Sequence, residues 1–185
     1  MRLFIALELP DVALRHLERL TDALRPVAPG ASFARPGNLH LTLKFLGESP
    51  DESVPGLCTA LESISAGELM LRANETLCFP PRGSIRIIGA SVESTSGDIL
   101  ALQSDIESAC HGLGYPRENR AFRPHVTLAR ACRPLPQALR ARLQTAAEPL
   151  LSGPAFTVSE FALIQSVLDS RGAQYTPLAR FGLAE

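Results

Sequence analysis

The sequence predicts an α+β fold with two pseudo-symmetric lobes, built on two mainly antiparallel sheets with helices on the outside and a central cleft. A His-x-Thr-Leu pattern occurs at residues 40–43 and again at residues 125–128, 85 residues further on. The same order of elements (helix, motif strand, helix, strand, strand) surrounds both copies. Strands outnumber helices and most connections permit antiparallel pairing, as is typical of α+β proteins. We therefore expect one two-lobed domain over residues 1–185.

The first half of the chain supplies the first round of this order. Leu14, Leu17, Leu20 and Leu24 recur along one helical face, and Asp11 stands where an N-cap is favoured. Residues 80–83, PPRG, are a turn signal. We expect strands at residues 2–9, 39–46, 68–79 and 84–93, helices at residues 11–24 and 52–65, and a loop at residues 26–37.

The second round begins after the polar residues 94–97. Ile99, Leu102, Ile106 and Cys110 recur at helical spacing, and Gly112 is a stop signal. We expect helices at residues 98–111 and 137–147, the second motif strand at residues 122–130, and strands at residues 155–168 and 173–181. The two halves share little sequence outside the motif, so the repeat rests on the order of elements.

Composition excludes several function classes. A 45% hydrophobic fraction suits a globular core, and a net charge of −1 gives no global drive toward nucleic acid or membrane, so any preference for a polyanion must be local. The four cysteines lie 20 or more residues apart, and no secretory signal or membrane-spanning run is present. We expect reduced core thiols in a cytoplasmic monomer without contact to a membrane.

The motif places its histidine and threonine side chains on one face of each strand. Alternate side chains leave the same face, so His40 lies beside Thr42, and His125 beside Thr127. An imidazole with a pKa of about 6.5 serves as acid or base at neutral pH. One can take a proton from a nucleophile while the other protonates a leaving oxygen, and the hydroxyls can bond phosphate oxygens. Neither motif offers a third metal ligand, so we expect no metal and no cofactor.

A single copy of this motif would be interpreted as an ordinary strand, because the pattern is short and threonine favours strands. His16 and His111, on expected helices, are likewise interpreted as structural. Two copies in equivalent places favour a shared catalytic site.

The motif segments resemble a known superfamily. Residues 38–47, NLHLTLKFLG, and residues 122–130, FRPHVTLAR, are similar to the paired motifs of the two-histidine phosphoesterases. Within these, the chain resembles the RNA 2′,3′-cyclic phosphodiesterases, also called LigT-like or 2′-5′ RNA ligases. The opening RLFIA at residues 2–6 and the closing Ser166, Gly172 and Tyr175 extend the resemblance over nearly the whole chain.

The resemblance implies metal-independent hydrolysis of RNA 2′,3′-cyclic phosphate ends to 2′-phosphates, with reversible 2′-5′ ligation of tRNA halves as a side activity. Carried over by motif position, His125 activates the water, His40 protonates the leaving 3′ oxygen, and Thr42 and Thr127 hold the phosphate. A two-fold site can be read in either direction, so the acid and base assignments stay open.

Arg130, which closes the second motif, resembles a family arginine associated with the substrate phosphate or base. Strict alternation puts it on the face opposite His125, and both a cleft and a surface position stay open. Lys44 shares the face of His40, although long lysines at strand ends usually extend to water. Phe4 and Phe45 could stack on a base, but core packing is the expected role of each.

A local basic cluster lies around the second motif and fits an RNA end or a solvated loop. Its members are Arg117, Arg120, Arg123, Arg130 and Arg133, with one acid, Glu118. Two alternatives remain: a phosphodiesterase for small cyclic nucleotides such as ADP-ribose 1″,2″-cyclic phosphate, and an RNA-end-binding module without turnover.

Overall fold

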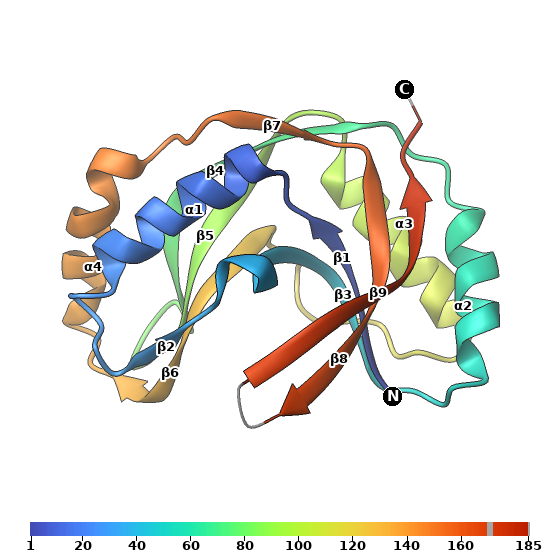
Figure 1. Ribbon diagram of the computed structural model, residues 1–185, viewed down its shortest axis with the longest axis horizontal. Coiled ribbons are helices and arrows are strands. Elements are labelled where there is room, and N and C mark those ends of the chain that lie inside the picture. Colours follow the sequence, from blue (N-terminus) through green and yellow to red (C-terminus); the bar gives the residue numbers. More distant parts are fainter. Residues whose placement is uncertain (170–171, 185) are drawn as a thin grey trace.

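The computed structural model describes residues 1–169 and 172–184. Within these residues, nine strands form one curled, mainly antiparallel sheet (Figure 1). The strands are β1 Arg2–Glu8, β2 Ala31–Phe33, β3 His40–Glu48, β4 Leu69–Phe79, β5 Ile85–Ser96, β6 His125–Leu135, β7 Ala155–Val158, β8 Glu160–Asp169 and β9 Gly172–Gly182. The helices are α1 Asp11–Leu24, α2 Ser53–Glu62, α3 Ile99–Gly112 and α4 Leu139–Ala147.

The two predicted sheets are halves of this one sheet. One half has the order β3-β1-β8-β9, and the other has the order β7-β4-β5-β6, with β2 also paired to β6. The halves meet where β3 pairs antiparallel with β6, at Leu41 opposite Val126. Both residues are fully buried. The two motif strands are therefore direct neighbours at the centre of the sheet.

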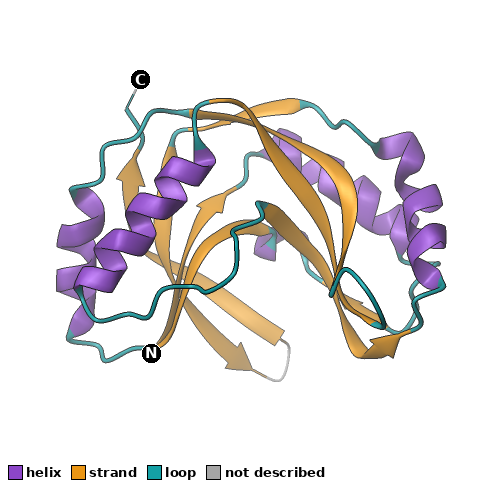
Figure 2. Cartoon of the chain, turned by 180° about the vertical axis from the view of Figure 1, so that it is seen from behind, coloured by secondary structure: helices purple, strands orange, loops and turns teal. Residues whose placement is uncertain are grey.

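Helices lie outside the sheet at both ends of the molecule (Figure 2). Helices α2 and α3 pack together, with α3 against β3, whereas α1 and α4 pack together against β4. Helix α1 belongs to the first half of the chain but covers the sheet half that holds β6. Each lobe is thus assembled from both halves of the chain.

The expected α+β class and the order of elements are confirmed, while several local predictions are wrong. Pro10, not Asp11, occupies the N-cap position of α1. The loop at residues 26–37 contains β2 and the start of a 3₁₀ turn, Pro36–Asn38. The single strand expected at residues 155–168 is interrupted at Ser159, so that β7 pairs with β4 and β8 pairs with β1. The chain changes sheet half at that point.

The cysteines are free, and Cys78 and Cys110 are buried as expected. Burial raises the pKa of the Cys110 thiol to about 11. Cys132, however, is exposed at the surface rather than in the core. None of the helices in the described part of the chain is both long and apolar enough to cross a bilayer.

Candidate active site

The pairing of β3 with β6 brings the two motifs together. Leu41 lies opposite Val126 in an antiparallel register. One step along each strand, this register sets His40 across from Thr127 and Thr42 across from His125. The two histidines and two threonines therefore alternate around a local two-fold axis on one face of the sheet.

Each motif imidazole is fixed by the same backbone hydrogen bond. Nδ1 of His40 lies 2.8 Å from the carbonyl oxygen of Asn38, and Nδ1 of His125 lies 2.7 Å from that of Arg123. A carbonyl only accepts, so Nδ1–H donates in both rings. In each neutral imidazole Nε2 is then left without a proton, ready to accept one.

Matching β-bulges follow the threonines in the two motif strands. The register of β3 against β1 skips Leu43, and the register of β6 against β5 skips Leu128. An extra residue at a bulge reverses the alternation of side chains beyond it. As a result Phe45 and Arg130, at equivalent positions, both line the cleft. The bulge thus settles the position of Arg130, for which strict alternation had given the opposite face.

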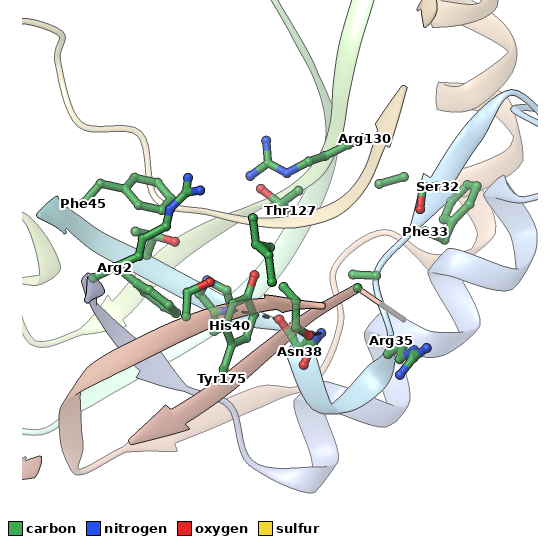
Figure 3. Close-up of a pocket in the computed structure, with 18 of the residues that line it drawn as sticks. Arg2, Ser32, Phe33, Arg35, Asn38, His40, Phe45, Thr127, Arg130 and Tyr175 are labelled. Atoms are coloured by element: carbon green, nitrogen blue, oxygen red, sulfur yellow. Dashed lines mark hydrogen bonds between the residues drawn. The ribbon is translucent and has the colours of Figure 1, made fainter. Parts of the chain in front are cut away.

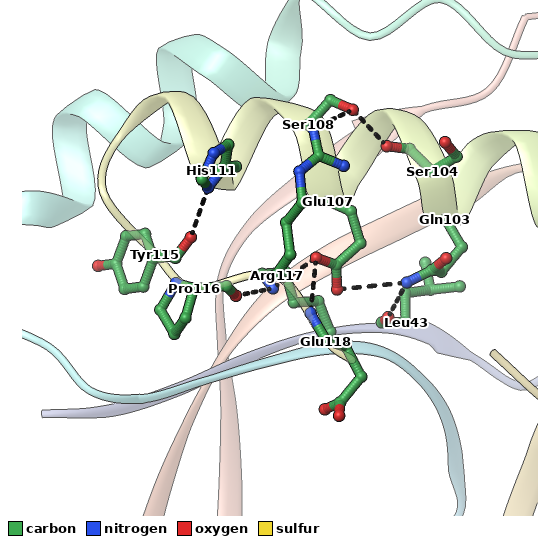
Figure 4. A network of polar contacts seen from close by, with 11 residues as sticks. Leu43, Gln103, Ser104, Glu107, Ser108, His111, Tyr115, Pro116, Arg117 and Glu118 are labelled. Carbon is green, nitrogen blue, oxygen red and sulfur yellow. Dashed lines mark hydrogen bonds and ion pairs between the residues drawn. The ribbon is translucent and has the colours of Figure 1, made fainter. Parts of the chain in front are cut away.

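The same bulge corrects the prediction for Lys44. Its side chain does not share the cleft face with His40 but is buried on the helix side, 5% exposed. Nζ donates to Glu107 Oε2 on α3 and to the Pro116 carbonyl oxygen, both at 2.9 Å. Glu107 also accepts from the backbone N–H of Glu118 (Figure 4). Lys44 therefore ties β3 to α3 and to the loop after it.

A groove of about 850 Å³ opens over the motif face. His40, Thr42, Thr127 and Arg130 line it. His125 is not among its lining residues; it lies on β6 beside them, partly exposed, with its ring centroid 4.8 Å from that of Phe79. The structure thus gathers four of the five predicted site residues around one groove, with the fifth on the neighbouring segment of strand.

His40 lies among aromatic rings. Its ring centroid is 4.8 Å from that of Phe4 and 5.1 Å from that of Tyr175 (Figure 3). Burial lowers the pKa of His40, the hydrogen bond to Asn38 opposes this, and the positive charge of Arg130 lowers the pKa further. Arg130 and His40 line the same groove although they belong to different halves of the sheet.

Several groove residues escaped prediction. Arg2, Arg35 and Asn38 line the groove. Asn38 also donates to the Ala173 carbonyl oxygen at 2.8 Å, which ties the start of the first motif to β9. Alternation along the first strand, which places Arg2 on the face of Phe4, was a usable signal. The turn that carries Arg35 had none, because its position depends on packing.

The predicted basic cluster is not gathered at the groove. Of its five arginines, Arg130 alone lines the groove. Arg117 instead donates to the Ser108 hydroxyl on the outer helix α3. The histidines interpreted as structural also lie elsewhere: His16 is buried in α1, and His111 is exposed on α3. Among the described residues, no group of three or more histidine, cysteine, aspartate or glutamate side chains is placed to hold a metal ion.

Comparison with known proteins identifies the family. The family model described as LigT-like phosphoesterase matches residues 7–89 and 90–175, two consecutive segments with one motif strand in each. The RNA 2′,3′-cyclic phosphodiesterase of Thermus thermophilus is 33% identical over 99% of this chain and 90% of its own length. Its namesake from Escherichia coli is 28% identical over 100% of this chain and 97% of its own length.

Solved structures agree with this assignment. TT0787 of Thermus thermophilus superposes with a TM-score of 0.82 at 30% identity, covering 99% of this chain and 98% of its own. Escherichia coli LigT complexed with 3′-AMP has the same fold, with a TM-score of 0.75 at 24% identity over 100% and 98% of the two chains. On this geometry, these relatives and the match of the family model to both halves, the chain belongs to the LigT-like phosphoesterase family.

Proposed function

We propose that this protein hydrolyses RNA 2′,3′-cyclic phosphate ends to 2′-phosphates, without a metal ion, and that His40 and His125 form the acid–base pair. The observation that carries the proposal is the shared anchoring of the two imidazoles, each through Nδ1 to the carbonyl oxygen two residues earlier. The names of the relatives support the choice of substrate.

In the proposed reaction a water oxygen attacks phosphorus and the bond from phosphorus to the 3′ oxygen breaks. One imidazole takes the proton of the water at Nε2, and the other gives a proton to the 3′ oxygen. Thr42 and Thr127 donate hydrogen bonds to the non-bridging oxygens, and Arg130 balances the negative charge that grows on them. The products are a 2′-phosphate and a 3′-hydroxyl.

By motif position we assign His125 as the base and His40 as the acid. Because burial lowers the pKa of His40, the free protein holds this ring mainly neutral at pH 7. The negative charge of a bound phosphate raises the pKa of His40 and so opposes the effects of burial and of Arg130. Binding of substrate therefore favours the protonated ring that the acid role needs. The pH dependence of the rate should be bell-shaped. A flat profile between about pH 5 and 9 would contradict an acid–base pair.

One incubation tests the reaction and its product. An oligonucleotide with a 2′,3′-cyclic phosphate end is treated with the protein in EDTA, and the new end is identified by mass spectrometry and phosphatase sensitivity. We expect a 2′-phosphate. A 3′-phosphate, a requirement for metal, or binding without turnover would each contradict the proposal.

The proposed reaction extends to ligation, because the 5′-hydroxyl of a second RNA can replace water as the nucleophile. We propose that 2′-5′ joining occurs when such an RNA is supplied at high concentration. Joined product should appear in the wild type and be lost in His40→Ala and His125→Ala. Joining that persists in either variant would contradict a shared site.

A further inference from the structure

We propose that Phe79 is a positioning residue that sets the orientation of the His125 imidazole, and that Arg140 on α4 holds Phe79 in place. This inference rests on the proposed function and extends the site to β4 and α4, which carry neither motif. Phe79 acts through His125, and Arg140 acts through Phe79.

The ring of His125 has fewer aromatic neighbours than that of His40 among the described residues. His40 contacts the rings of Phe4 and Tyr175. His125 contacts the ring of Phe79, with 4.8 Å between the centroids and 46° between the planes. The hydrogen bond from Nδ1 to the backbone fixes one atom of the His125 ring, and the packed phenyl ring limits its tilt. The direction of Nε2, which takes the proton of the water in the proposed reaction, therefore depends on Phe79.

A glycine on β5 leaves room for this contact. Phe79 on β4 is the partner of Ile87 on β5. His125 on β6 is the partner of Ser91, four residues further along the same strand. Gly89 lies between these two partners, and a Cβ on it would lie 3.5 Å from the His125 ring. The missing side chain thus allows the phenyl ring and the imidazole to meet across β5.

Arg140 binds the backbone on both sides of Phe79. Nη1 donates to the Cys78 carbonyl oxygen at 3.1 Å, and Nη2 donates to those of Pro80 at 3.0 Å and Gly83 at 3.2 Å. A guanidinium is planar and rigid, so its two amino groups fix these carbonyls relative to one another. Helix α4 therefore fixes the backbone from which the Phe79 side chain extends.

A second contact from the start of α4 holds the same turn. Gln137, two residues before the helix, accepts at Oε1 from the backbone N–H of Gly83 at 3.2 Å. Two roles for Arg140 are compatible with these contacts: to stabilise the turn alone, or to hold Phe79 against His125 as well. Only the second role reaches the chemical step, so the two roles predict different results.

The first test replaces the phenyl ring. An oligonucleotide with a 2′,3′-cyclic phosphate end is turned over by wild type, Phe79→Leu and Phe79→Tyr. Phe79→Leu removes the flat ring and should lower kcat roughly tenfold, because a small displacement of a reacting group slows the chemical step. KM should change little, since Phe79 acts on the base and not on binding. Phe79→Tyr keeps the ring at this partly exposed position and should restore kcat.

The second test removes the guanidinium. Arg140→Gln should lower kcat as Phe79→Leu does. Arg142→Gln is the matched control, because Arg142 is exposed on the same helix, and it should keep the wild-type kcat. Since Arg140 acts through Phe79, the double variant Phe79→Leu/Arg140→Gln should be no slower than Phe79→Leu alone.

Proton NMR of the histidine rings separates positioning from a general loss of stability. The ring current of Phe79 shifts the ring-proton signals of His125, so these signals should move in Phe79→Leu and in Arg140→Gln. They should stay in place in Arg142→Gln. The ring-proton signals of His40 should stay in place in all three variants, because the effect is confined to the other motif.

The possible failures are distinguishable. A rise in KM at unchanged kcat in Phe79→Leu, or unmoved His125 signals in Arg140→Gln, would overturn the proposal while the phosphodiesterase activity stands. Movement of the His40 signals, or effects on kcat that add in the double variant, would overturn it as well. If the wild type turns over no substrate, the proposed function is wrong, and the His125 signals alone decide whether Phe79 and Arg140 orient the ring.

Discussion

At equivalent places after the two threonines, β3 carries Lys44 and Phe45 where β6 carries Ala129 and Arg130. The backbone of the two strands is closely matched, with the same histidine anchor and the same bulge. Their surroundings differ, because His40 packs against Phe4 and Tyr175 whereas His125 packs against Phe79. The comparison teaches that a two-fold backbone can place two similar groups in different surroundings.

The largest effect, on stability, is expected from Lys44, the buried charge of β3 that has no counterpart in β6. Lys44→Met leaves Glu107 buried without its cation, which should lower the free energy of unfolding by about 3–5 kcal/mol. Urea unfolding measures the loss. The double variant Lys44→Met/Glu107→Leu should recover most of it, because both charges are then replaced by apolar groups. If Lys44→Met unfolds like the wild type, the pair does not support the first motif strand.

Removing either motif imidazole tests the feature that the two strands share. His40→Ala and His125→Ala should each lower kcat roughly 10²-fold or more, the usual scale for the loss of a general acid or base. His111→Ala, on the exposed face of α3, is the control and should keep the wild-type rate. A near-normal rate in either motif variant would show that the site is not two-fold in its chemistry.

The strands next to the motifs offer a finer comparison. Thr42 lies opposite Ala6 on β1, and Thr127 lies opposite Gly89 on β5. A Cβ on Gly89 would meet the Val126 carbonyl oxygen at 2.9 Å and the His125 ring at 3.5 Å. Gly89→Ala should therefore destabilise the fold by about 1–3 kcal/mol, the usual cost of overpacking, and displace His125.

Thermal unfolding and the rate at saturating substrate test this variant. Ala6→Gly is the reciprocal control and should leave the position of His40 unchanged. A fully active and stable Gly89→Ala protein would contradict this prediction, because β6 would then accommodate the added methyl group without displacing His125.

The smallest effect concerns the protonation of His40. Its pKa is lowered in the folded state, so below the ordinary value of about 6.5 the unfolded chain binds the proton more readily than the native protein. The free energy of unfolding should fall as the pH drops through this range. Burial and the charge of Arg19 lower the pKa of His16 as well, so both histidines contribute with the same sign.

Urea unfolding of His40→Gln at neutral and acidic pH isolates the contribution of His40. The decrease in the free energy of unfolding on acidification should be smaller in this variant than in the wild type. Arg130→Met should raise the pKa of His40 in an NMR titration, and Arg117→Met should leave it unchanged. An unmoved pKa in Arg130→Met would remove the electrostatic link between the two halves.

The spacing of apolar residues, together with turn and helix-stop residues, predicted most of the fold. Helices with apolar stripes and strands with alternating residues are local patterns. The motif predicted which four residues converge, since two His-x-Thr strands in equivalent places leave few other arrangements. The bulges were not predictable, because an extra residue in a strand carries no local signal and shows only in the register with its neighbour. That single feature explains why Lys44 was assigned to the wrong face and why Arg130 could not be assigned.

The break at Ser159 and the placement of α1 were not predictable from the sequence for a related reason, since both depend on which sheet half an element packs against. Each half contains strands from both ends of the chain: β1 and β3 share theirs with β8 and β9, and β4 and β5 share theirs with β6 and β7. A proteolytic cut between β5 and α3 would therefore not separate the lobes. The two fragments would need each other to complete either half of the sheet, and we expect them to co-purify and to regain activity together after joint refolding, which neither should do alone.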